Sequence, residues 1–144
     1  MKLLVSLFFY LSLVTSSENI MEEFHLLSSE KDEKLFVEKY KNDTSPTIQG
    51  YVCAVEMKQA EYVFNPITKL KIFNTSKKKL DSLVFENPTN LDLRYIRLLL
   101  QERTPSILGY NDFIKEDKNI LKTKIESRQV SEEFINYIYR NTSL

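Results

Sequence analysis

The chain has 144 residues, enough for one domain, and its apolar (42%) and charged (28%) fractions are those of a globular protein with a packed core. Twenty basic residues balance twenty acidic ones, so the formal net charge is zero. This balance argues against non-specific nucleic-acid binding and against a polybasic membrane anchor, because both need an excess of Lys and Arg.

The N-terminus has the pattern of a targeting segment. A basic residue at Lys2 is followed by an apolar run from Leu3 to Val14, and then by the small residues Thr15, Ser16 and Ser17. This pattern predicts a secretory signal peptide over residues 1–17, because the run is shorter than the ~20 residues that span a bilayer. The alternative interpretation is an uncleaved anchor or a core helix. We therefore expect export to the periplasm or the cell exterior, and no membrane span after cleavage.

The remaining residues, 18–144, are predicted to form a single α-helical domain. Gly and Pro occur only two and four times, which leaves little material for β-hairpins, and no sustained apolar–polar alternation indicates a sheet. We expect about six or seven helices packed as antiparallel hairpins. Cys53 is the only cysteine, so no internal disulfide is possible. It lies in the apolar run 51–55 and is predicted to be a small buried hydrophobe.

Three helices are expected in the first half of this domain. Residues 18–28 repeat apolar side chains at helical spacing. Ser29 with Asp32 is typical of a capping box, so a second helix should follow and end before residues 42–45, with Leu35, Phe36 and Tyr40 facing inward. A third helix should start at Ser45-Pro46, because Pro is tolerated at the first helical position, and run to about residue 63. Its small residues Gly50 and Ala54 would allow close helix approach.

Polar–proline breaks at Asn65-Pro66, Asn87-Pro88 and Thr104-Pro105 delimit a central helical hairpin. Its first helix, over about 67–85, should bury an apolar stripe of Ile67, Leu70, Phe73, Leu80, Leu83 and Val84. Its second helix should open at Pro88, with Thr89 and Asp92 as a second capping box. A sixth helix is expected over about 110–126 and a seventh from Ser131.

The chain lacks the residues that most catalytic and metal-binding sites require. His25 is the only histidine, and it forms no zinc-like spacing with Cys53, so we expect it to pack in the core or at its rim. Gly50 and Gly109 are too few for a phosphate-binding loop. Adjacent carboxylates such as those at 22–23 diverge on a helix. We therefore expect no enzymatic activity, no metal and no cofactor.

One polar cluster on the predicted fifth helix is a candidate ligand-binding site. Arg94, Arg97 and Gln101 recur at helical spacing on one face. Two guanidinium groups and an amide could bind a carboxylate or phosphate through paired hydrogen bonds. The alternative is that the arginines pair with acidic residues of neighbouring helices, such as Asp81 or Asp117.

The central segment resembles a group of small, uncharacterised, exported helical proteins of Bacteroidetes-type bacteria, over about half of the chain. The motifs that carry the resemblance are Asn65-Pro66, Asn87-Pro88-Thr89-Asn90-Leu91-Asp92-Leu93-Arg94-Tyr95-Ile96-Arg97-Leu98 and Leu108-Gly109-Tyr110. Ser76, Leu80 and Pro88 also resemble the small, large and proline positions of a tetratricopeptide hairpin. The resemblance implies a helical scaffold outside the cytoplasm and brings no catalytic residues.

We therefore expect a protein–protein interaction module or structural scaffold with an unknown protein partner. The second hypothesis is a small protein that binds an anionic ligand through Arg94, Arg97 and Gln101.

Overall fold

The computed structural model describes residues 20–144, and this part of the chain contains helices and no strands, so the predicted all-α class is confirmed. The predicted signal peptide, residues 1–17, lies outside the described residues. After a helical segment over 20–26 come α2 (Glu30–Tyr40), α3 (Pro46–Gln59), η1 (Ala60–Tyr62), α4 (Pro66–Glu86), α5 (Leu91–Arg103), η2 (Ser106–Leu108), α6 (Ile114–Glu126) and α7 (Glu132–Asn141).

Local signals set most helix starts where they were predicted. The Ser29 hydroxyl accepts a hydrogen bond from the Asp32 backbone N–H (3.1 Å), and the Ser131 hydroxyl accepts one from Phe134 N–H (3.2 Å). Pro46 and Pro66 stand in the first turns of α3 and α4. These contacts are made within three residues of the helix end, which is why the sequence alone could locate them.

The predicted start of the fifth helix is wrong by three residues. α5 begins at Leu91, and its cap is Asn90, whose side chain accepts a hydrogen bond from Leu93 N–H (3.1 Å). A turn closed by a hydrogen bond from Asn90 N–H to Asn87 O (3.0 Å) occupies the preceding residues. Asp92 does not complete a capping box and instead accepts a hydrogen bond from the Tyr51 hydroxyl (2.9 Å).

The predicted start of the sixth helix at Tyr110 is also wrong, because α6 begins at Ile114. Tyr110 is buried, stands edge-on to Phe73, and donates its hydroxyl proton to Asp81 (3.1 Å). The chain before it reverses through η2 and Gly109, whose φ of 60° lies in the left-handed region that glycine tolerates best. The tertiary contacts of Tyr110 thus hold this residue outside α6, which is shorter than predicted.

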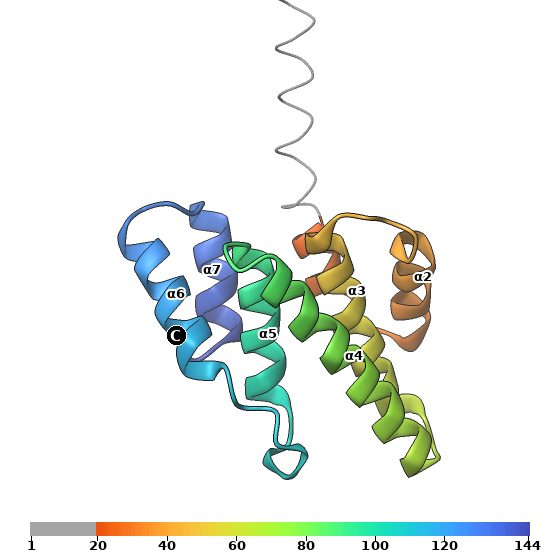
Figure 1. Ribbon diagram of the computed structural model, residues 1–144. Coiled ribbons are helices and arrows are strands. Elements are labelled where there is room, and N and C mark those ends of the chain that lie inside the picture. Colours follow the sequence, from red (N-terminus) through yellow and green to blue (C-terminus); the bar gives the residue numbers. More distant parts are fainter. Residues whose placement is uncertain (1–19) are drawn as a thin grey trace, which may run out of the picture.

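The helices form successive antiparallel hairpins, with α3 and α5 between outer helices (Figure 1). Both inner helices contribute most of the main core, which includes Tyr51, Val52, Cys53, Ala54, Val55, Leu93, Tyr95, Ile96, Leu98 and Leu99. At Gly50 the two helices meet closely, since a Cβ there would lie 2.3 Å from Leu93 Cδ2. The predicted close approach at Gly50 is therefore confirmed.

Three side chains predicted to face the core are exposed: Ile67 (79%), Leu70 (47%) and Leu35 (58%). For α4 the reason lies in the packing angle. α4 and α5 are joined through residues 87–90, and they diverge toward the other end of the bundle (Figure 1). α5 therefore does not cover this part of the apolar stripe, although α3 and η1 still contact α4.

Candidate functional site

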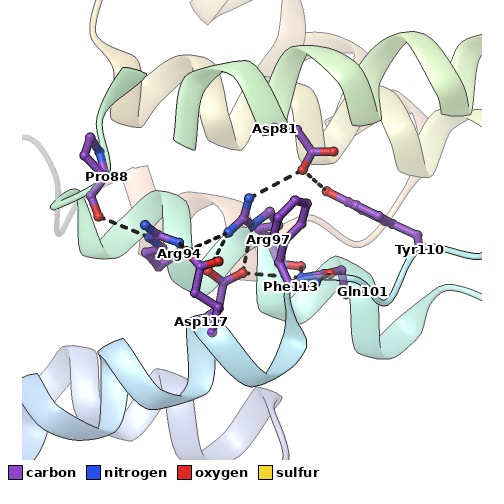
Figure 2. A network of polar contacts seen from close by, with 9 residues as sticks. Asp81, Pro88, Arg94, Arg97, Gln101, Tyr110, Phe113 and Asp117 are labelled. Atoms are coloured by element: carbon purple, nitrogen blue, oxygen red, sulfur yellow. Dashed lines mark hydrogen bonds and ion pairs between the residues drawn. The ribbon is translucent and has the colours of Figure 1, made fainter. Parts of the chain in front are cut away.

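The predicted arginine cluster lies at the junction of α4, α5 and α6 (Figure 2). Arg97 binds Asp117 with two hydrogen bonds, from Nε to Oδ2 (2.8 Å) and from Nη2 to Oδ1 (2.7 Å). Asp117 is fully buried and the Arg97 side chain is nearly so. The Arg97 guanidinium also lies over the Phe113 ring, 4.0 Å from its centroid. This side chain is held on several sides by the protein itself.

Arg94 and Gln101 complete the cluster around the same carboxylate. Arg94 donates from Nη1 to Asp117 Oδ1 (3.0 Å), pairs with Glu116, and donates from Nε to the Pro88 carbonyl (3.1 Å). Gln101 donates to Asp117 Oδ2 (3.3 Å) and accepts a hydrogen bond from the backbone N–H preceding α6 (2.9 Å). The cluster thus ties the start of α6 to the buried face of α5.

Asp81 of α4 forms the outer edge of the cluster, 3.8 Å from Arg97 Nη1. Burial raises the pKa of Asp81, and the Tyr110 hydrogen bond and the Arg97 charge oppose this rise. Burial lowers the pKa of Arg97, but hydrogen bonding to Asp117 and the Asp117 charge raise it by more. The hydrogen bonds to Asp117 and the Asp117 charge therefore keep the Arg97 guanidinium charged, and its hydrogen-bond partners come from the protein itself.

These contacts confirm the interpretation that the arginines pair with Asp117 and Asp81. Two guanidinium groups face three carboxylates, including Glu116, so the positive charge is already matched. A cavity of about 860 Å³ borders the cluster, lined by Arg94, Arg97 and residues of α4 such as Lys77 and Lys78. Because this cavity adjoins the paired side chains, the hypothesis of an anionic ligand at Arg94, Arg97 and Gln101 stays a prediction.

A second buried charge, Glu33 of α2, was not identified from the sequence. Its side chain is fully buried, with Oε1 2.7 Å from Lys58 Nζ and within hydrogen-bond reach of the Tyr62 hydroxyl (3.3 Å). Oε2 has no hydrogen-bond partner among the described residues. Helical spacing places Glu33 on the same face as Phe36 and Tyr40, so periodicity could have indicated its burial.

His25 and Cys53 take the structural positions that were predicted for them. The imidazole stacks on the Tyr137 ring (4.8 Å between centroids), and its Nε2 lies 2.8 Å from the Tyr95 hydroxyl. Burial and the nearby Arg103 charge lower the pKa of His25 to about 4. Cys53 is fully buried in the main core, and burial raises its pKa to about 12.

A concavity with a mainly apolar lining lies between the diverging ends of α4 and α5, with the end of α3 as its floor. We call it the apolar cleft; it has a volume of about 500 Å³. Its apolar lining comes from the three helices, η1, the segment after α5 and the 20–26 helix, and comprises Phe24, Ala54, Met57, Ala60, Pro66, Leu70, Phe73, Leu99, Leu100, Pro105 and Leu108. Met57 and Phe73 also belong to a small second core with Tyr110, which supports the floor.

Large apolar side chains are exposed in the apolar cleft and at positions close to its lining in the sequence. Leu70 (47% exposed) and Leu108 (38%) line the cleft itself. Phe64, Ile67 and Ile107 are also exposed, and they are next or close in sequence to the lining residues Pro66 and Leu108. Single exposed hydrophobic residues are common, but a group around a concavity is typical of an interaction surface.

Residues 20–144 contain no cluster of three or more His, Cys, Asp or Glu side chains suited to hold a metal ion. Among the helices of the same residues, none has both the length and the apolar character needed to cross a bilayer. In comparisons with known proteins, no family model, no curated protein and no solved structure matches this chain.

Proposed function

We propose that this chain is a helical protein-interaction module that binds its partner in the apolar cleft. The observation that carries the proposal is the apolar lining of an open concavity with Leu70 and Leu108 exposed at its rim. Covering this surface would remove apolar area from water, which is the main driving force of protein association. The paired arginine cluster serves as the structural tie that holds α5 and α6 together.

Site-specific photo-crosslinking in cells that produce the protein tests this proposal. A photoreactive residue at position 108 should form a defined adduct, identified by mass spectrometry, and Leu70→Ser should reduce its yield. The matched control is Phe85→Ser, because Phe85 is equally a large exposed residue of α4 (84%) but lies outside the apolar cleft. Equal adduct yields from a photoreactive residue at exposed position 139 of α7, or no adduct at 108, would contradict a binding role of the cleft.

We also propose that this binding takes place after export, in the periplasm or outside the cell. The support is the sequence of residues 1–17, with Lys2, the apolar run and the small residues at its end. N-terminal sequencing of the protein from cell fractions tests this proposal. Export predicts a chain that begins near Ser17 or Glu18 in the extracytoplasmic fraction, whereas an intact Met1 in the cytoplasmic fraction would refute it.

A further inference from the structure

We propose that the occupant of the apolar cleft is an acidic amphipathic helix of a partner protein. This inference rests on the proposed function and adds the chemistry of the partner. It depends on the charges at the rim of the cleft, its shape, and the kinds of backbone that the protein can recognise.

The rim charges favour an acidic partner. Four charged residues line the cleft: Lys58, Glu61, Lys69 and Arg103. Lys58 is paired with the buried Glu33 (2.7 Å), whereas Lys69 and Arg103 form no ion pair within residues 20–144. Arg103 donates one hydrogen bond, to Asn141 (3.2 Å), which leaves its charge unneutralised. Glu61 is the only carboxylate that opposes these two exposed cations in the cleft lining.

The positive charge at the rim comes from the start of α4 and the end of α5. Residues 62–80 contain five lysines and no Asp or Glu, and of these Lys69 lines the cleft. Lys71 lines a separate concavity with Glu56, and Lys77 and Lys78 lie beside the arginine cluster. Lys69 and Arg103 therefore carry the local excess of positive charge in the cleft lining. Electrostatic complementarity of this kind selects partners of the opposite sign.

The shape and backbone of the site favour a helix. The described residues form no strand, so they present no sheet edge to which an extended peptide could add. The cleft instead lies between diverging helices, and a helical partner could place apolar residues at i, i+3, i+4 and i+7 onto its floor. A flat bilayer surface would reach the rim side chains but not the concave floor formed by Met57 and Phe73.

Like charge also disfavours a second copy of this chain as the occupant. In a two-fold symmetric dimer the same surface patch meets itself. The excess of positive charge from Lys69 and Arg103 in one copy would then face the same excess in the other. An acidic helix removes this repulsion and provides carboxylates for both cations.

Fluorescence anisotropy with synthetic helices tests the inference. Three labelled peptides of about 18 residues share one leucine face at i, i+3, i+4 and i+7, and carry Glu, Gln or Lys at the other positions. Their helix content is matched by circular dichroism. We expect the Glu peptide to bind about tenfold more tightly than the Lys peptide at low salt, and this difference to shrink as salt screens the rim.

Charge reversal assigns the preference to particular residues. The double variant Lys69→Glu, Arg103→Glu should prefer the Lys peptide, whereas Lys79→Glu, Arg140→Glu, which reverses two exposed cations outside the cleft, should keep the Glu preference. Leu70→Ser should weaken binding of the Glu peptide and Phe85→Ser should not. Equal affinity for the three peptides, binding to none, or a preference that survives charge reversal would overturn the inference.

Two further outcomes would also overturn it. Sedimentation that shows a dimer disrupted by Leu70→Ser would identify a second copy as the occupant. Leu70-dependent binding to vesicles of equal parts phosphatidylglycerol and phosphatidylcholine, without peptide binding, would identify a membrane surface. The proposed function is judged separately by the crosslinking at position 108. If those adducts persist while the Glu peptide shows no preference, only the partner chemistry is wrong.

Discussion

Replacing Asp117 by Asn should destabilise the domain more than any other single isosteric change in the arginine cluster. The buried carboxylate accepts hydrogen bonds from Arg94 Nη1 (3.0 Å), Arg97 Nε (2.8 Å), Arg97 Nη2 (2.7 Å) and Gln101 Nε2 (3.3 Å). Asn keeps one oxygen, which can still accept the hydrogen bonds from Arg94 Nη1 and Arg97 Nη2. Its amide group would face Arg97 Nε and Gln101 Nε2, and both of these are donors.

The magnitude follows from the burial of the two arginines, which have side-chain exposures of 6% and 4%. Removing one partner of a buried ion pair costs about 3–5 kcal/mol, because the remaining charge is left without compensation. This is a large part of the ~5–15 kcal/mol that stabilises a typical domain. The melting temperature should fall by about 10–20 °C for a domain of this size.

Urea and thermal denaturation followed by far-ultraviolet circular dichroism measure this loss. The matched control is Asp112→Asn, because Asp112 is exposed just before α6, and its replacement should change the unfolding free energy by less than about 0.5 kcal/mol. The double variant Asp117→Leu, Arg97→Met should recover much of the stability, since both charges of the main pair are then absent. If Asp117→Asn were no more costly than Asp112→Asn, the cluster would not be the structural tie described above.

Three further predictions concern the core and its pH dependence. The pKa of His25 lies below its unfolded value of 6.5, at about 4, so the neutral imidazole stabilises the fold, and stability should be lost as pH falls from 6.5 to 4. Because the imidazole is partly exposed and solvent screens its charge, the loss should be about 1–2 kcal/mol, and it should be absent from His25→Gln. The imidazole signal in NMR spectra should titrate near the lowered pKa. Gly50→Ala should lower the unfolding free energy by up to about 2 kcal/mol, because crowding of Leu93 outweighs the gain in helix propensity. Urea denaturation measures this change, and a variant more stable than the original chain would contradict the prediction. Cys53 should react with a thiol reagent only as fast as the protein unfolds, and rapid labelling of the native state would refute its burial.

The helical class and most helix positions could be predicted from the sequence because their causes are local. Ser29 and Ser131 cap helices through residues three positions away, and Pro46 and Pro66 restrict the backbone at their own positions. The errors at Thr89 and Tyr110 share one cause. At both places a side chain forms a tertiary contact, Asp92 with Tyr51 and Tyr110 with Asp81, that a local pattern does not encode.

The candidate site was only partly predictable for a similar reason. The face that carries Arg94, Arg97 and Gln101 follows from helical spacing, and Asp117 was one of the partners considered. Choosing that partner required the packing of α6 against α5, because the paired residues are 20 or more positions apart in the chain. The apolar cleft was not predicted, since the stripe on α4 was assumed to be buried along its whole length.

The sequence by itself therefore determined an all-α chain with most of its helix starts, a neutral total charge, and a single cysteine placed in an apolar run. Those properties depend on interactions within one or two helical turns, or on composition alone. Only the tertiary structure decided that the arginines are paired and that Leu70 is exposed at a cleft. Both outcomes depend on where α4, α5 and α6 lie relative to one another, since the angle between two helices decides which parts of an apolar stripe are covered.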